Sequence, residues 1–370
     1  MANMNRIFVI GLLFLCANIN LLIAQKVDLS SVDEFFKVTS TLKEGKEISM
    51  EQWKAFDSSR SYERYAKRKD PFVINSIRNT INIVFGNDTL AKKDSILGIT
   101  QEEMKQDPIK MFKKGIFNNY LSINKNYESI KSFRDNYDFN VLVERAKQRL
   151  SSFLGLPMDS ITKLKPVYFL FVTADGKNNE DAIYVDFNFI YLETERQRID
   201  FLAHEFFHNY REQLENHNFN YKNYMNHCVD MIQNEGIADL IDKAEGYKKY
   251  FSDTGELPES AEMWENLYNQ APHDMERLQN LILKYSKKEI SEKNMENELD
   301  DIIRFNGHPI GFFMADHIVS AGYKKELLVS FYNPYEFFCL YNKAAKKQNI
   351  FQLSNEFMDY LKSLTKEYYH

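Results

Sequence analysis

The sequence predicts a mostly α fold of the α+β class with a small β-sheet, and three observations support this prediction. Of the 370 residues only 13 are Gly and 8 are Pro, which favours long helices with short connections over a many-turned β-sandwich. Apolar residues recur at three- and four-residue spacing through most of the chain. Between about 166 and 190 this spacing gives way to short apolar and alternating runs, which are typical of strands.

The first 24 residues have the pattern of a secretory signal peptide. One basic residue, Arg6, precedes an apolar core that ends at small Ala24, so we expect cleavage between Ala24 and Gln25. A membrane anchor is the alternative, but the apolar run is shorter than the roughly 20 residues that a spanning helix needs. A lipoprotein that uses Cys16 is disfavoured by bulky Leu15. We therefore expect an exported protein, periplasmic or secreted, with no membrane span after cleavage.

The charge of the chain argues against a nucleic-acid partner. The formal net charge is −6, and loss of Arg6 with the leader changes it by one, to −7. Acidic and basic residues are interspersed without a basic block. Cys228 and Cys339 remain after cleavage, and the sequence is compatible with one disulfide or with two unpaired thiols.

Residues 25–150 are predicted to form an N-terminal helical region. The stretch S-S-V-D-E-F-F-K opens with a Ser/Asp capping pattern, and residues 134–150 have apolar side chains at helical spacing. No pattern in this region indicates chemistry, so we expect it to form one wall of a cleft against residues 151–370. The two regions could also form one compact unit.

Two strands joined by a polar loop are predicted to precede the long helices of the second region. The first strand is P-V-Y-F-L-F-V-T and the second is A-I-Y-V-D-F-N-F-I. From Thr194 the chain returns to helix through about Tyr250, and more helices follow a polar connection near 252–260. Pro309 suits a first helical turn and Gly322 suits a helix stop.

The stretch A-H-E-F-F-H-N-Y carries the clearest chemical signal. His204 and His208 are four residues apart, so on a helix both imidazoles project from one face about one turn apart. This separation lets two nitrogens bind one zinc ion. Glu205 projects to the side, where a carboxylate can accept a proton from a zinc-activated water. The alternative is a core helix with two hydrogen-bonded histidines and no metal.

A catalytic zinc site needs a third protein ligand, and N-E-G-I-A-D supplies the candidate. Glu235 follows His208 by 27 residues, enough for a loop and a return helix. Asp239 lies on the same helical face, where a carboxylate can accept the spare N–H of a ligating imidazole. Small Gly236 and Ala238 are expected to let the two helices approach closely. Taken alone, Glu235 and Asp239 could instead be a solvated acidic pair.

Together, H-E-F-F-H and N-E-G-I-A-D resemble the paired motif of the gluzincin class of zinc metallopeptidases, the thermolysin-like His-Glu-x-x-His with Glu-x-x-x-Asp. More narrowly, D-G-K-N-N-E-D-A-I-Y-V-D and G-H-P-I-G-F-F-M-A resemble segments of bacterial families of zinc-dependent peptidases of unknown function. The resemblance covers about 160–325. It implies one zinc ion per chain with His204, His208 and Glu235 as ligands. It also implies Glu205 as general base and Asp239 as hydrogen-bond partner of a ligating histidine.

The metzincin class is excluded because its pattern needs Gly and His where this chain has Arg211 and Leu214. Peptide hydrolysis also needs a donor to the developing oxyanion. His308 is the first candidate because N-G-H-P places it at a predicted helix start, while Tyr332 and Tyr335 are weaker candidates. The alternative for His308 is a helix-capping or surface role.

Three hypotheses follow from these patterns. The first is an exported zinc metallopeptidase that acts on a peptide or protein substrate. The second is a non-catalytic zinc-bearing protein that binds a peptide or a partner, and the intact Glu205 argues against it. The third is a helical scaffold without metal. The resemblance further implies that, if residues 183–186 lie at the edge of the sheet by the cleft, an extended peptide would add to them by main-chain hydrogen bonds.

Overall fold

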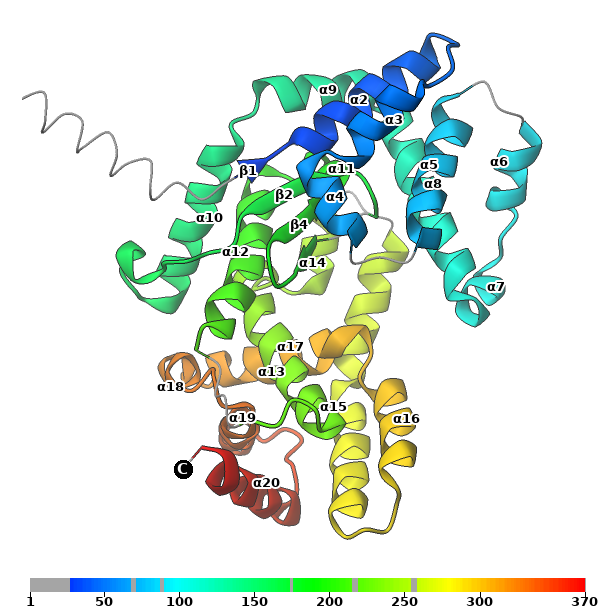
Figure 1. Ribbon diagram of the computed structural model, residues 1–370. Helices are drawn as coiled ribbons and strands as arrows, with labels where there is room; N and C mark the ends of the chain where they lie inside the picture. Colours follow the sequence, from blue (N-terminus) through cyan, green and yellow to red (C-terminus); the bar gives the residue numbers. More distant parts are fainter. Residues whose placement is uncertain are drawn as a thin grey trace, which may run out of the picture. The chain divides into compact units, whose positions relative to one another are not determined.

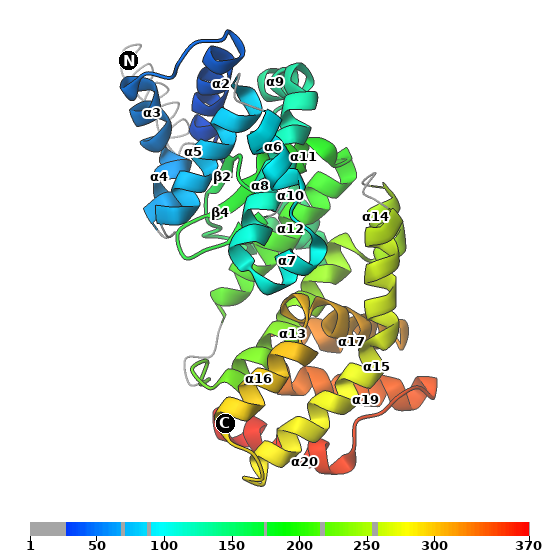
Figure 2. The same ribbon diagram turned by 90° about the vertical axis from the view of Figure 1, so that its right-hand side faces the viewer.

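The described part of the chain is mostly helical with one small sheet (Figure 1, Figure 2), which confirms the predicted fold class. The computed structural model describes residues 27–67, 71–86, 90–173, 176–214, 219–253 and 258–369. The predicted signal peptide, residues 1–24, lies outside the described residues. Within the described ranges, every helix is too short or too polar to cross a bilayer.

Packing divides the chain into two compact units. Of the described residues, one unit contains those from 27 to 143 together with those of 163–191, and the other contains 144–162 together with those from 192 to 369. The predicted boundary at residue 150 separates two regions by their expected roles. Packing does not test such a boundary, so it stays a prediction.

The first unit is built around a four-stranded sheet of strand order β1-β2-β4-β3. β1, β2 and β4 are parallel, and β3 is antiparallel to β4. Helices α2 and α4 pack on β2, whose side chains, like those of β4, are all buried. The strands are β1 (Val27–Asp28), β2 (Val167–Leu170), β3 (Gly176–Asn178) and β4 (Ile183–Asp186). The helices are α2 (Ser30–Lys43), α3 (Met50–Asp57), α4 (Arg60–Lys67), α5 (Pro71–Phe85), α6 (Leu90–Leu97), α7 (Gln101–Gln106), α8 (Pro108–Lys125), α9 (Tyr127–Asn136), the start of α10 (Phe139–Leu154) and α11 (Phe187–Leu192).

Two strands of this sheet differ from the sequence prediction. β1 lies in the region 25–150, which is predicted to be helical, and β3 lies in the polar stretch predicted to be a loop. Both are two or three residues long, and pairing with a neighbouring strand, rather than their own residue pattern, makes them strands. Because β4 pairs with β2 on one side and with β3 on the other, residues 183–186 are not at a free edge, and the condition for adding a peptide strand to them is not met.

All regular elements among the described residues of the second unit are helices, and this unit carries the motif residues. Thr194 caps α12 through a capping box with Gln197, as expected for a helix that starts there. Pro309 lies in the first turn of α17 and Gly322, with φ +88°, follows its end, so both predictions are confirmed. The elements are the rest of α10, η1 (Met158–Ser160), α12 (Glu195–Glu212), α13 (Tyr224–Asp242), α14 (Tyr247–Asp253), α15 (Pro258–Ser286), α16 (Glu292–Ile302), η2 (Phe305–Gly307), α17 (His308–Ser320), α18 (Lys324–Val329), α19 (Pro334–Gln348) and α20 (Asn355–Tyr368).

The two cysteines of the second unit are both free thiols. Cys228 on α13 is buried, and Cys339 on α19 is partly exposed. Of the two alternatives that the sequence left open, the structure therefore has the unpaired thiols.

Helices α13 and α17 cross with their backbones in contact at two glycines. A Cβ atom on Gly236 would overlap the carbonyl group of Gly311, and one on Gly311 would overlap the carbonyl oxygen of Ile232. Gly307 also lies against Ile232, so the Gly-x-x-x-Gly spacing of residues 307–311 fits α13. Gly236 therefore allows a close approach as predicted, but its partner is α17 and not the motif helix α12.

Replacing Gly236 by Ala is expected to destabilise the protein by about 1–3 kcal/mol or more, because the added methyl group forces the two backbones apart. Gly115→Ala on α8 is the matched control, since nothing lies within 4 Å of its added Cβ. The control should be neutral or stabilising by up to about 1 kcal/mol. Urea unfolding followed by circular dichroism measures both, and equal stability of Gly236→Ala and wild type would contradict this packing.

Candidate metal centre

Helix α12 places His204 and His208 on one side of a largely buried helix. All residues from Phe201 to Asn209 are buried, which explains why Phe206 and Phe207 occupy positions where a solvated helix would carry charges. The side chains of His204 and His208 are only 6% and 10% exposed. Two buried imidazoles need polar partners, and these come from α13.

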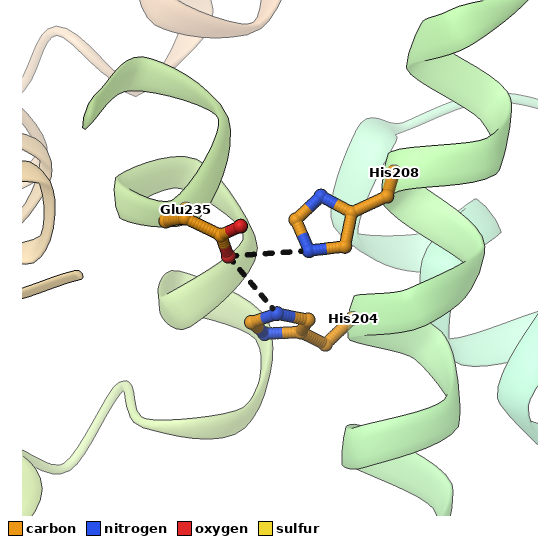
Figure 3. A group of neighbouring side chains, drawn as sticks. All are labelled: His204, His208 and Glu235. Carbon is orange, nitrogen blue, oxygen red and sulfur yellow. Dashed lines mark ion pairs between the residues drawn. The ribbon is translucent and has the colours of Figure 1, made fainter. Parts of the chain in front are cut away.

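Glu235 on α13 faces both imidazoles with the same carboxylate oxygen (Figure 3). Its Oε2 lies 3.3 Å from Nε2 of His208 and 3.6 Å from Nε2 of His204. One ligand atom from each residue lies within 4.8 Å of the other two. Ligand atoms on a tetrahedral zinc ion with bonds of about 2.0–2.2 Å are about 3.4 Å apart. The two distances from Oε2 of Glu235 to the imidazole nitrogens are therefore close to the separation of zinc ligands.

The other ring nitrogen of each imidazole is held by a hydrogen-bond acceptor. Nδ1 of His204 lies 3.1 Å from Oδ1 of Asp242, and Nδ1 of His208 lies 3.0 Å from Oδ1 of Asn234. Because these oxygens accept, Nδ1 carries the hydrogen, and in a neutral ring Nε2 directs its lone pair toward Glu235. Two lone pairs repel a facing carboxylate unless a proton or a metal ion lies between them. The donor set therefore fits a zinc ion.

The buried charges around Glu235 determine its ionisation. Burial by itself raises the pKa of Glu235, but His208 and His308 outweigh burial and hold this pKa well below its ordinary range. For His204, burial lowers the pKa, while Asp242 and Glu235 raise it well above its ordinary value. Without metal, protons on the imidazoles therefore compensate the negative charge of the carboxylates. Binding of a metal ion displaces these protons.

The acceptor nearest to Nδ1 of His204 is Asp242, whereas the sequence pointed to Asp239. Asp239 lies 3.7 Å from this nitrogen, and both of its oxygens lie 3.0 Å from Nδ1 of His308. Asp242 follows Glu235 by seven residues and Asp239 follows it by four, so all three share one helical face. This spacing is a signal from which Asp242 could have been identified.

Lys243 lies between the two aspartates. Its Nζ is 2.8 Å from Oδ1 of Asp239 and 2.7 Å from Oδ2 of Asp242. His204, Asp239 and Asp242 form a second possible metal group, but the ammonium group of Lys243 already supplies a cation to both of its carboxylates. The group that contains Glu235 is therefore the better metal candidate.

Of the two predicted catalytic residues, Glu205 lies on α12 beside His204, and His308 lies on α17. Nε2 of His308, the first residue of α17, lies 3.2 Å from Oε2 of Glu235. Neither of the two candidate metal groups found among the described residues contains His308. His308 therefore contacts Glu235 but does not belong to the group that Glu235 forms with His204 and His208. Glu205 follows His204 on α12 and is 6% exposed.

The two tyrosines that were weaker candidates lie elsewhere. Tyr335 is fully buried and its hydroxyl donates to Oδ1 of Asn226, 2.7 Å away. The ring of Tyr332 is exposed and packs beside Tyr369.

Arg211 entered the sequence analysis only because it excludes the metzincin class. In the structure it joins α12 to α13. It is buried, forms an ion pair with Asp230 and donates to Oε1 of Gln233, 3.0 Å away. It also donates to the main-chain carbonyl of Phe331 at 3.1 Å. A buried guanidinium with its hydrogen bonds satisfied fixes the register of the two helices near His208.

The family model described as "Putative zinc dependent peptidase (DUF5700)" matches residues 53–350, and the chain belongs to this family. No curated protein and no solved structure matches the chain. The family description agrees with the donor set, since two imidazoles and one carboxylate are ligands that zinc prefers.

Asp242→Asn is expected to lower zinc affinity about 10–100-fold, because the amide no longer holds Nδ1–H of His204 as a carboxylate does. Asp239→Asn should change zinc affinity less, because Asp239 contacts His308. Competition with a chromophoric chelator measures both affinities, and circular dichroism checks folding. A greater loss of zinc affinity in Asp239→Asn than in Asp242→Asn would contradict this assignment.

Proposed function

Because the chain belongs to a family described as putative zinc-dependent peptidases, we propose that it is an exported, gluzincin-type metallopeptidase that hydrolyses peptide bonds. One zinc ion per chain is held by His204, His208 and Glu235. The observation that carries the proposal is the approach of two imidazole Nε2 atoms to one carboxylate oxygen, at 3.3 and 3.6 Å. Export rests on the leader pattern of the first 24 residues.

Glu205 is the general base of the proposed reaction. Zinc, when bound, supplies Lewis-acid activation of water and of the scissile carbonyl group. Glu205 takes the proton of the attacking water and passes it to the leaving amine. One helical step turns Glu205 by about 100° from His204, so its carboxylate can act beside the ligands without being one of them.

His308 donates to the developing oxyanion. Asp239 holds its Nδ1 at 3.0 Å, which fixes the ring and leaves Nε2 on the side of Glu235. Burial lowers the pKa of His308, but Asp239 and Glu235 outweigh burial and raise it. In the imidazolium form Nε2 carries a hydrogen that can stabilise negative charge on the substrate oxygen.

Glu205→Gln tests the proposed reaction, because glutamine cannot accept the proton. We expect an unchanged zinc content and a loss of hydrolysis of about 10²–10⁴-fold, measured with fluorescently labelled casein and elemental analysis. Glu212→Gln, at the exposed end of the same helix, is the control and should retain both properties. An active Glu205→Gln would contradict the proposal. Wild-type protein that binds zinc but cleaves no peptide would favour the non-catalytic alternative.

His308→Gln tests the oxyanion donor. The expected result is a fall in kcat of about 10²–10³-fold, with little change in KM and none in zinc content. His317→Gln, near the other end of α17, is the matched control. Loss of zinc from His308→Gln would make His308 a ligand, and unchanged kcat would remove its catalytic role.

A further inference from the structure

Three consecutive residues before α17 have a left-handed backbone. The φ angles are 50° at Phe305, 54° at Asn306 and 87° at Gly307. Asn and Gly tolerate this conformation, but a bulky aromatic residue rarely adopts it. Phe305 is also 49% exposed, so burial of its ring does not offset the cost of this backbone conformation. An unfavourable backbone that presents an apolar ring to solvent points to a function.

Contacts on both sides of Phe305 hold this conformation in place. Arg304 donates to Oδ2 of buried Asp274 at 2.5 Å and to Oε1 of Gln270 at 3.2 Å, both on α15. On the other side, Gly307 lies against Ile232 of α13. The backbone at Phe305 is therefore fixed between two helices.

The Phe305 ring extends a row of rings that begins at His308. The ring of Trp264 on α15 lies 4.7 Å from Phe305 and 6.3 Å from His308, nearly perpendicular to the imidazole at 86°. Tyr247 and Phe251 pack on Trp264 at 4.9 and 5.7 Å, which fixes the indole. The side chain of His308 is 21% exposed and Phe305 is 49% exposed. A fixed aromatic surface thus leads from the candidate site to solvent.

We propose that Trp264 and Phe305 form a subsite that binds an aromatic or large aliphatic side chain of the peptide substrate beside the scissile bond. This inference rests on the proposed function and adds a substrate class to it. The ring edges and faces favour aromatic partners. Arg304 is engaged by Asp274, so the surface next to it offers apolar contact rather than an available positive charge. Contacts of this kind discriminate between side chains by about 10–200-fold.

The chain contains only two tryptophans, which makes the subsite measurable. Trp53→Phe leaves Trp264 as the single tryptophan, and Glu205→Gln in the same chain prevents turnover of the probe. The probes are acetylated and amidated peptides Ala-Ala-Gly-X-Ala-Ala, with X as Ala, Leu or Phe, added to the zinc-loaded protein. The emission of Trp264 should change on binding, with a Kd at least about 10-fold lower for Phe than for Ala.

Phe305→Gly in this background should abolish the difference between the peptides without lowering Tm, because glycine accepts the positive φ angle. Val329→Ala, which removes part of another exposed apolar side chain of the second unit, should preserve the difference. Equal Kd values for the three peptides, no response of Trp264 at millimolar peptide, or discrimination that survives Phe305→Gly would overturn the subsite.

Cleavage of the same peptides by protein that retains Glu205 tests hydrolysis separately. Cleavage without preference for Phe would leave the proposed function standing and overturn the subsite. A selective response of Trp264 without cleavage would support the subsite and contradict the hydrolytic function.

Discussion

The approach of His204 and His208 to one oxygen of Glu235 is the interaction on which the candidate metal centre depends. All three facing atoms are acceptors when the imidazoles are neutral, and they lie in a site from which water is largely excluded. Such a cluster persists only if a cation joins its members. The surrounding contacts keep the members in place, since Asp242 and Asn234 hold the rings and Arg211 holds the two helices together.

The charges behind the imidazoles are consistent with a divalent ion. Glu235, Asp239 and Asp242 are three carboxylates, and Lys243 is one ammonium, so this group carries a net charge of −2. Protons on the histidines can compensate this charge in part, but each one occupies a nitrogen that zinc would use. Two of these carboxylates orient different histidines. Asp242 orients His204, a candidate zinc ligand, and Asp239 orients His308, the candidate oxyanion donor. Lys243 forms an ion pair with each of the two aspartates and so holds both carboxylates in place.

Local spacing explains how much of this arrangement the sequence could predict. The shared face of His204 and His208 follows from helical periodicity, and the start of α17 follows from Pro309, so both could be read from neighbouring residues. The division of roles between Asp239 and Asp242 depends on which ring lies against which turn of α13. That choice is made by tertiary contact, and spacing alone shows only that both aspartates share a face with Glu235.

Tertiary contact also decides the features that the sequence missed. Gly236 indicates a close helix approach, but only the packed structure identifies Gly311 as its partner. The short strands β1 and β3 exist because neighbouring strands pair with them, and their own residues give no strand signal. The left-handed backbone at Phe305 contradicts the preference of its residue type, so no local pattern could have predicted it.

Anomalous diffraction at the zinc edge, from crystals of the protein grown with zinc, tests directly whether His204, His208 and Glu235 hold a zinc ion. We expect one strong peak, about 2.0–2.2 Å from Nε2 of His204, Nε2 of His208 and a carboxylate oxygen of Glu235. A peak beside Asp239 and Asp242 instead, or no peak in these crystals, would contradict zinc binding by His204, His208 and Glu235. The histidines and Glu235 would then form a protonated ion-pair cluster.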